Sequence, residues 1–272
     1  QLLPLAVGAK LALFGIGTFD YVKGGGGSGD VTVPYIRNLY DGLCQVVDPA
    51  TIFPDTVDFY RKDVQAQYAA GRAPGMTVEP ELPDELVRKA AVFTDTAIVS
   101  FSRFSGENWD RKASFDPQTS HKNASMELVN TLGEIFEDGD FYLSRAERAM
   151  LDKVRAAFKR VIVVLNTGAV METASLKADP AIGAVLLAWQ GGMEGGLAIA
   201  DILCGDVNPS GKLADTWART YSDIPFADQF SYLNGNLKEE FYREGIYVGY
   251  RYFDTFGVEP AYPFGFGLSY TD

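Results

Sequence analysis

The chain has 272 residues, 47% of them hydrophobic and 22% charged, which is ordinary for a globular protein with one large or two small domains. The 36 acidic residues exceed the 24 basic ones, and the net charge of −12 argues against a nucleic-acid-binding protein, because an acidic surface repels phosphates. No uninterrupted apolar run is long enough to span a membrane. Neither a nucleic acid nor a membrane is therefore an expected partner.

Four apolar segments predict strands, because continuous apolar runs are typical of strands that are covered on both faces. They are residues 10–15, 96–101, 161–166 and 184–189. Amphipathic helical segments alternate with them. This order predicts an α/β fold with a parallel sheet between layers of helices.

A glycine-rich segment follows the first strand, with four consecutive glycines at residues 24–27 and then Ser28 and Gly29. Such a run indicates backbone of positive φ or the close approach of a ligand. A phosphate-binding loop is one alternative, but the Gly-Lys-Ser/Thr ending of a P-loop is absent. From these residues alone a flexible turn is the favoured interpretation, and Ser28 is the only side chain of the run that offers a polar contact.

The segment 105–111 follows the second strand, at the edge of a parallel sheet where ligands usually bind. Glu107 lies there beside a glycine and near Trp109. Partial desolvation by these neighbours would raise the pKa of the carboxyl group and suit a general acid. The alternative is a solvated loop glutamate, with Asp110 and Arg111 forming an ordinary surface pair.

Other residue types of catalytic and metal sites are sparse. His121 is the only histidine, and neither a Gly-x-Ser-x-Gly elbow nor a Cys/His cluster accompanies it, so no catalytic triad, metal or cofactor is predicted. Residues 123–125 fit a glycosylation acceptor, a triplet that is common by chance. Cys44 and Cys204 lie in apolar stretches and are expected to be buried free thiols rather than a disulfide.

A helix is predicted directly before the third strand. Ser144 and Glu147 have the spacing of a capping box. Apolar side chains recur behind them at helical spacing, at Ala146, Met150, Val154 and Phe158. A helix followed at once by an apolar strand is half of a βαβ unit.

Glycines surround Glu194 in residues 191–196, just before or within a predicted helix at 194–203. An anion site at the helix N-terminus is one alternative, but close packing of the helix is the favoured explanation of the glycines. From about residue 221 aromatic residues become dense, and we expect an irregular C-terminal wrap whose rings lie in the core or in domain contacts. The chain starts almost at a strand and stops just after Tyr270, so we expect a domain of a larger protein.

Seven segments, taken together and in this order, resemble glycoside hydrolase family 3. They are residues 23–29, 105–107 with Asp110 and Arg111, 164–168, 194–196, 205–213, 245–252 and 263–270. Each is weak alone, but they cover nearly the whole chain. The resemblance implies a six-stranded, mostly parallel α/β sandwich of flavodoxin-like fold over residues 1–272.

The resemblance also implies roles for two residues. In this family a separate (β/α)8 barrel supplies an aspartate nucleophile, and the sandwich supplies the acid/base glutamate of a Ser-Gly-Glu-Gly-x-Asp-Arg motif. That role falls on Glu107, although Asn108 stands where the family usually has glycine. The serine of the glycine-rich loop commonly reaches the sugar of the −1 subsite, which implies substrate binding by Ser28.

The expected function is retaining hydrolysis of terminal β-D-glucosyl residues, completed by a barrel outside this chain, so that the chain alone is inactive. A β-xylosidase or arabinofuranosidase is an alternative, because the barrel largely shapes the pocket of the −1 sugar. A different alternative is a binding module of flavodoxin-like fold that holds a small ligand or carbohydrate without chemistry.

Overall fold

The computed structural model describes residues 2–107, 109, 111–114, 132–227, 239 and 241–271. At its centre four parallel strands form a sheet in the order β1-β2-β3-β4. Their bounds are Ala12–Phe14 for β1, Thr96–Arg103 for β2, Arg160–Thr167 for β3 and Ile182–Leu187 for β4. The four predicted strands are thus confirmed, each with bounds shifted by one or two residues at one or both ends.

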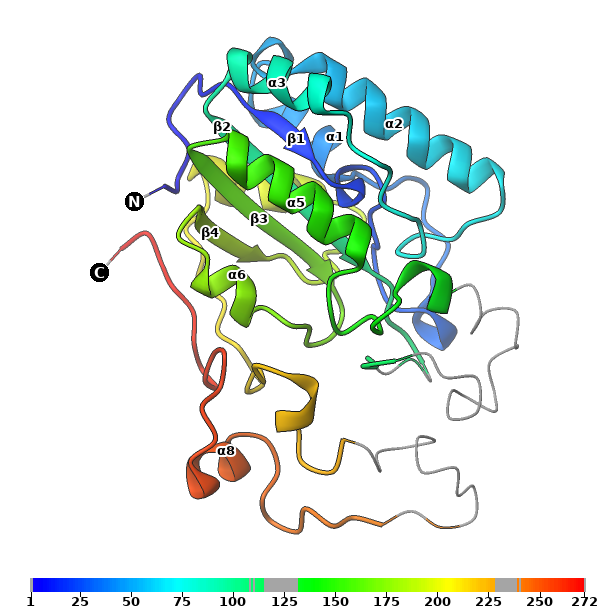
Figure 1. Cartoon of the computed structure of the whole chain (residues 1–272), viewed down its shortest axis with the longest axis vertical. Coiled ribbons are helices and arrows are strands. Elements are labelled where there is room, and N and C mark those ends of the chain that lie inside the picture. Colours follow the sequence, from blue (N-terminus) through cyan, green and yellow to red (C-terminus); the bar gives the residue numbers. More distant parts are fainter. Residues whose placement is uncertain are drawn as a thin grey trace.

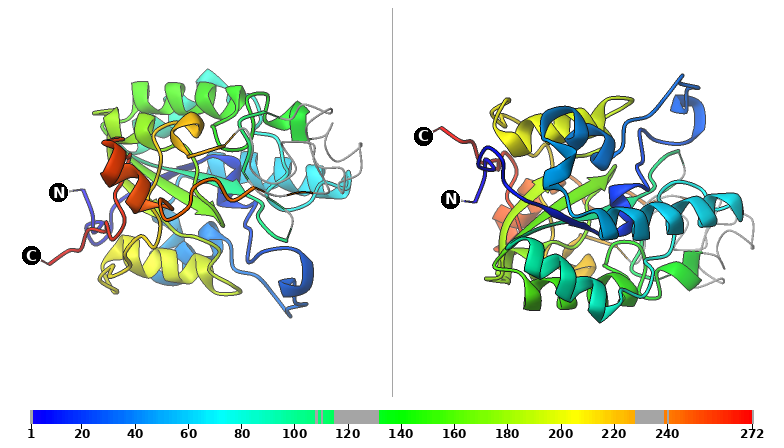
Figure 2. Two further views of the ribbon diagram at one scale, coloured as in Figure 1. Left: turned by 90° about the horizontal axis from the view of Figure 1, so that it is seen from below. Right: turned by 90° about the horizontal axis from the view of Figure 1, so that it is seen from above.

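Helices cover both faces of this sheet, as the edge-on views of Figure 2 show. On one face α1 (Leu39–Val46) and α7 (Gly195–Cys204) pack against Leu13, Ile98 and Val164. On the other face α3 (Asp84–Phe93) and α5 (Arg145–Ala157) pack against alternate strand residues such as Phe14 and Val99. The expected α/β fold with a parallel sheet is confirmed.

Shorter and peripheral elements complete the described chain. Helix α2 (Pro54–Ala69) lies beyond β1 in Figure 1 and contributes Val57 to one core cluster and Tyr60 to the other. The remaining elements are η1 (Ile16–Thr18), η2 (Gly27–Gly29), η3 (Pro49–Thr51), α6 (Ala174–Ala178), η4 (Tyr221–Asp223) and α8 (Tyr250–Phe256).

Helix α5 begins as the sequence predicts. The Ser144 hydroxyl accepts a hydrogen bond from the Glu147 amide, and the Glu147 carboxylate accepts one from the Ser144 amide, which completes the capping box. Met150 and Val154 are buried, and Phe158 packs edge-on against Phe14 of β1 with ring centroids 5.3 Å apart. The helix is therefore held by its cap and by its apolar stripe.

The sheet has four strands among the described residues, and the implied count of six is not confirmed. A fifth strand is begun but not continued beside β1, where Leu11 and Ile52 form a single parallel bridge. The Leu11 amide donates to Thr51 and the Phe53 amide donates to Leu11, both at 2.8 Å. Pro54 follows and has no amide hydrogen, so the ladder stops and α2 begins.

The glycines near α7 serve close packing, as favoured from the sequence. A side chain on Gly196 would collide with the backbone of Asn38 at the start of α1, and one on Gly195 would collide with the Tyr21 ring. Gly42 of α1 in turn meets the backbone of Gly196. The two helices can approach this closely only because these positions carry no Cβ.

The C-terminal aromatic residues were expected in the core or in domain contacts, and many of them lie outside this chain's core. Phe253 of α8 is buried, but large apolar side chains around it are exposed: Phe241, Tyr242, Ile246, Tyr247, Val248, Tyr250, Phe256, Phe264 and Leu268. Within this chain they have too little surface to pack against, since residues 241–271 lie along one end of the sandwich (Figure 1). Their use in a domain contact stays a prediction.

Both cysteines are free, as expected, but each is partly exposed rather than buried. Cys44 lies in α1 at the margin of a core cluster, and Cys204 is the last residue of α7. Within the part of the chain that the structure describes, no helix has the length and apolar character of a membrane span.

Candidate functional site

The glycine-rich loop and the Glu107 loop follow two neighbouring strands, β1 and β2. After β1 the chain passes through α1 to Ile52 on the outer side of β1, and then returns through α2 and α3 to β2 on the inner side. The strand order therefore reverses at β1, and ligands of open α/β sheets bind beyond the carboxyl ends of strands at such a point. Both loops lie at this end of the sheet, toward which the strand arrows of Figure 1 point.

The two loops contact each other through main-chain atoms. The Gly26 amide donates to the Ser105 carbonyl at 3.0 Å, and the Glu107 amide donates to the Gly26 carbonyl at 3.3 Å, which makes a parallel bridge between Gly26 and Gly106. A Cβ on Gly106 would lie 2.5 Å from the Gly26 nitrogen, and a Cβ on Gly26 would lie 2.5 Å from the Phe104 ring. This contact, the loop seam, therefore requires glycine on both sides.

Beyond the loop seam, Ser28 and Glu107 meet directly. The Glu107 Oε2 accepts hydrogen bonds from the Ser28 amide and from the Ser28 hydroxyl, both at 3.2 Å. The two residues that the sequence singles out thus lie together, 79 positions apart in the chain. Two donors bind one carboxylate oxygen, and the second oxygen accepts no hydrogen bond from the residues that the structure describes.

Glu107 is not desolvated by its own loop. Its side chain and that of Ser28 are exposed, while the Trp109 ring packs edge-on against Phe104 with centroids 5.4 Å apart. The partial burial expected from the neighbouring glycine and tryptophan is therefore not found in this chain. The cause is the direction of Trp109, which contacts Phe104.

Arg111 is buried, which corrects the alternative of an ordinary surface pair with Asp110. Its guanidinium donates to the Phe104 carbonyl at 2.6 Å, to Asp140 Oδ2 at 2.7 Å and to the Thr167 hydroxyl at 3.0 Å. Burial lowers the pKa of this arginine and the Asp140 carboxylate opposes that effect, so the group keeps its charge. Asp110 and Asn108 lie outside the described residues.

Asn166, near the end of β3, forms hydrogen bonds to the chain segments that lead into two loops. Its Oδ1 accepts from the Val22 amide at 2.7 Å, and its Nδ2 donates to the carbonyls of Val22 at 3.0 Å and Trp189 at 2.6 Å. Val22 leads into the glycine-rich loop, and Trp189 follows β4 with a positive φ of 53°. The buried Asn166 side chain thus makes hydrogen bonds to both segments that a neighbouring strand would otherwise make.

Two buried carboxyl groups, those of Asp20 and Glu79, hold the segment between β1 and the glycine-rich loop. Asp20 accepts hydrogen bonds from the Gly75 amide, the Thr77 hydroxyl and the Tyr68 hydroxyl, and burial raises its pKa above the ordinary value. Glu79 accepts from the Ile16 amide and the Tyr60 hydroxyl, both at 2.8 Å, and burial raises its pKa to about 8. Both groups fasten the segment 75–79 to the residues that follow β1.

Glu194 has structural partners at the start of α7. It accepts hydrogen bonds from the Tyr35 hydroxyl and from Arg37 Nε at 2.6 Å. The Tyr35 hydrogen bond, with a further contribution from Arg37, lowers the pKa of this carboxyl group. Glu194 is the N-cap residue of α7, but its side chain makes no capping hydrogen bond, so its contacts join the start of the helix to residues 35–37.

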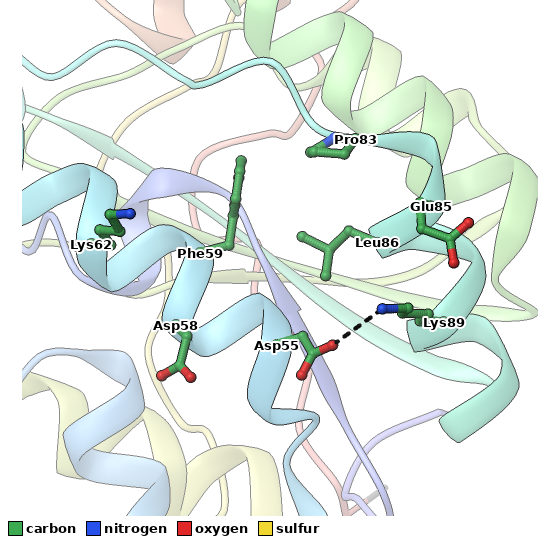
Figure 3. A pocket seen from close by; sticks show the side chains of 8 residues that line it. All are labelled: Asp55, Asp58, Phe59, Lys62, Pro83, Glu85, Leu86 and Lys89. Carbon is green, nitrogen blue, oxygen red and sulfur yellow. Dashed lines mark ion pairs between the residues drawn. The ribbon is translucent and has the colours of Figure 1, made fainter.

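The described residues hold no second site built from the remaining sequence candidates. His121 and residues 123–125 lie outside the described residues, among which no group of three His, Cys, Asp or Glu side chains could hold a metal ion. An open groove of about 380 Å³ lies between α2 and α3 (Figure 3) and is lined by Asp55, Asp58, Phe59, Lys62, Pro83, Glu85, Leu86 and Lys89. None of the predicted site residues lines this groove.

Sequence reasoning missed Asp140, Asn166, Asp20 and Glu79 as residues that hold the site. A polar residue near the end of an otherwise apolar strand was the available signal for Asn166. Asp140 is one acidic residue among several near position 138, and nothing local distinguishes it. Its partner Arg111 lies 29 positions away.

Comparisons with known proteins identify a family and several relatives. Residues 1–250 match the family described as "Glycosyl hydrolase family 3 C-terminal domain". "Beta-glucosidase A" of Butyrivibrio fibrisolvens is 52% identical over 275 residues, an alignment that covers 100% of this chain and 32% of that protein. An "Exo-alpha-(1->6)-L-arabinopyranosidase" of Bifidobacterium longum is 30% identical, with 98% of this chain and 29% of that protein covered.

A solved structure shows the same fold. "Beta-glucosidase 3B from Thermotoga neapolitana in complex with glucose" has a TM-score of 0.81 and 35% identity, and the match covers 99% of this chain and 35% of that chain. The chain thus spans about a third of the length of these relatives. By its family match, its relatives and its fold, the chain belongs to glycosyl hydrolase family 3, as the C-terminal domain of that family.

Proposed function

We propose that this chain is the acid/base-bearing domain of a β-glucosidase that hydrolyses terminal β-D-glucosyl residues with retention of configuration. The observation that carries the proposal is the Ser28–Glu107 pair, held by two loops at the reversal point of the strand order. A (β/α)8 barrel outside this chain supplies the aspartate nucleophile. Relatives named β-glucosidases, three times as long as this chain, support that division.

In the proposed mechanism Glu107 acts twice. As an acid it gives a proton to the glycosidic oxygen while the barrel carboxylate attacks the anomeric carbon, and as a base it then deprotonates the water that releases the sugar. Retention requires the two carboxyl groups to lie about 5–5.5 Å apart. The exposed position of Glu107 supports this role, because a second protein surface can approach the carboxylate.

Ser28 is assigned to substrate binding. Its hydroxyl lies within hydrogen-bonding distance of Glu107, so a sugar hydroxyl bound by Ser28 is held next to the acid/base group. Glucose is the favoured sugar, because β-glucosidases are the relatives with 52% and 35% identity. A terminal pentopyranose is the second candidate, because the arabinopyranosidase of Bifidobacterium longum covers nearly the same residues.

The test is Glu107→Gln in the full-length enzyme. We expect kcat/KM to fall steeply for phenyl β-glucoside, whose leaving group needs a proton, and to fall little for dinitrophenyl β-glucoside, whose leaving group does not. Added azide should restore turnover of the activated substrate, because azide replaces the water that Glu107 would deprotonate. Equal losses on both substrates without azide rescue would reject the acid/base role.

Glu172→Gln is the matched control. Glu172 also accepts hydrogen bonds from the amide and the hydroxyl of one serine, Ser175, at 2.7 and 2.6 Å. It lies before α6 and outside both loops. Its replacement should leave both kcat/KM values unchanged, so that a loss in Glu107→Gln cannot be attributed to breaking a serine–glutamate pair in general. Unchanged turnover in Glu107→Gln would favour a binding module.

A further inference from the structure

We propose that Arg111 and Asp140 are positioning residues for Glu107: their buried ion pair closes the acid/base loop at its base and holds the carboxylate at the distance that proton transfer requires. The inference rests on the proposed function of Glu107. It adds a role for two residues that touch neither the sugar nor the reacting atoms.

Arg111 joins the two ends of the loop. Phe104 precedes Ser105, Gly106 and Glu107, and its carbonyl accepts from Arg111 Nη1 at 2.6 Å. The same nitrogen donates to Asp140, and Nη2 donates to the Thr167 hydroxyl at the end of β3. One guanidinium therefore fixes the start of the loop, its end and the neighbouring strand in a single geometry, which its rigid planar fork makes possible.

Asp140 holds the outgoing arm of the same loop. Its Oδ1 accepts from the Lys112 amide at 2.8 Å, and its Oδ2 accepts from Arg111 and, at 3.4 Å, from the Trp109 indole. The side chains of Arg111 and Asp140 are 6% and 2% exposed. Because the pair is out of water, loss of either charge leaves the other unpaired, and the loop must rearrange.

Phe104 transmits this arrangement to Glu107. The Phe104 ring lies against Gly26, where a Cβ would come within 2.5 Å, and against the edge of Trp109. Gly26 in turn accepts from the Glu107 amide across the loop seam. A shift of Phe104 therefore moves the backbone of Glu107, and a displacement of about 1 Å can lower a rate by about 10²-fold.

A second buried pair in the chain provides a matched control. Arg103 makes two 2.6 Å hydrogen bonds to the Glu147 carboxylate, with exposures of 1% and 4%. Glu147 also accepts from a backbone amide, that of Ser144, as Asp140 does from Lys112. This pair fastens β2 to α5, and Glu147 lies outside the 104–111 loop. Arg103 itself also donates to the Asp140 carbonyl at 3.3 Å, so the control changes Glu147 and leaves Arg103 in place.

The experiment compares Asp140→Asn, Glu147→Gln and Glu107→Gln in the full-length enzyme, with rates expressed per folded active site after titration with a mechanism-based fluoroglucoside. For Asp140→Asn we expect kcat/KM for phenyl β-glucoside to fall by about 10²-fold, while the value for dinitrophenyl β-glucoside stays nearly unchanged. Glu147→Gln should lower the melting temperature but keep the same ratio between the two substrates as the parent enzyme.

Arg111→Lys is the second variant, for use if Asp140→Asn does not fold. Lysine keeps the charge but cannot bridge Phe104 and Thr167 at once, so the same dependence on leaving group is expected at a smaller loss of stability. A uniform loss on both substrates in these variants would overturn the positioning role of Arg111 and Asp140. If Glu107→Gln itself shows no dependence on leaving group, the proposed function fails instead, and the two failures are distinguished.

Discussion

Gly27 lies directly against Glu107: a Cβ built on Gly27 would fall 2.5 Å from the carboxylate Oε2 and 2.6 Å from the Glu107 Cβ. The same glycine has a φ of +82°, which L side chains rarely adopt. Two independent requirements therefore exclude a side chain at this position. The carboxylate can sit over the glycine-rich loop and bind Ser28 only because Gly27 is bare.

Replacing Gly27 with alanine should displace Glu107 and break its hydrogen bonds to Ser28. We expect kcat/KM of the full-length enzyme for phenyl β-glucoside to fall by about 10²-fold, since the proposed acid/base group is moved by about an ångström. The melting temperature should fall modestly, because alanine is strained at this φ while the loop itself is exposed. Steady-state kinetics with thermal unfolding checks both expectations.

The matched control is Gly24→Ala in the same loop. A Cβ on Gly24 has no atom within 4 Å, and its φ lies outside the left-handed region. We expect kcat/KM to stay within about twofold of the parent value, since the change meets neither strain nor contact. An equal loss in both alanine variants would show that the loop is sensitive to any added methyl group and would contradict the role given to Gly27.

Asn166→Asp should destabilise the protein in a pH-dependent way. A carboxylate cannot donate to the carbonyls of Val22 and Trp189, so one buried and one partly buried acceptor lose their donor and face a negative charge. We expect the free energy of unfolding to fall by about 2–3 kcal/mol near neutral pH. Urea titrations should show a smaller deficit in acid, where the protonated group can donate again.

Asn208→Asp serves as the control for that prediction. Asn208 also donates through its amide, to Thr271 at 3.3 Å, but it lies on the surface. The free energy of unfolding should change by less than about 0.5 kcal/mol, as is usual for exposed positions. A deficit of Asn166→Asp that does not vary with pH would indicate a packing defect rather than a lost donor.

Glu79 should make the protein less stable as the pH rises. Burial raises its pKa to about 8 in the folded state, against 4.5 for an ordinary glutamate, so the folded protein binds the proton more tightly than the unfolded chain does. The stabilisation is therefore complete below about pH 4.5 and is lost as the pH rises to about 8. Within that window the slope approaches about 1.4 kcal/mol per pH unit.

The measurement compares the parent with Glu79→Gln, whose neutral side chain cannot titrate. Asp20 also has a raised pKa and contributes a slope of the same sign, but it is present in both proteins. The difference between the two free energies of unfolding therefore isolates Glu79 and should decline with rising pH. A difference that is constant from acid to alkaline pH would show that folding does not raise the pKa of Glu79.

The strands and helix α5 were predictable from local pattern. Residues 161–166 are apolar without interruption, as a strand between two layers of helices must be, and Ser144 with Glu147 marks a helix start by spacing alone. Helix α2 was not predicted, although Pro54 at its first position and the spacing of Val57, Tyr60 and Val64 were visible signals. Charged residues interleaved with these few apolar ones obscured the pattern.

The candidate site likewise has a part that the sequence could predict and a part that it could not. The meeting of Ser28 and Glu107 could be expected, because their loops follow strands of one parallel sheet and their motifs resemble a known family. The contacts that hold those loops could not, because Asn166 and Val22 are 144 positions apart and Ile16 and Glu79 are 63 apart. Such pairs are selected by the folded arrangement, and a buried polar residue shows no local sign of its partner.

The loop seam between Gly26 and Gly106 has a consequence for diversification of these enzymes. Its hydrogen bonds use only amide and carbonyl groups, so they are indifferent to which sugar is bound. Side chains at the tips of both loops can therefore be exchanged for new substrate preferences while Glu107, the proposed proton donor, keeps its position. A designer who grafts foreign loop tips onto this domain needs to preserve those two glycines before any residue that faces the sugar.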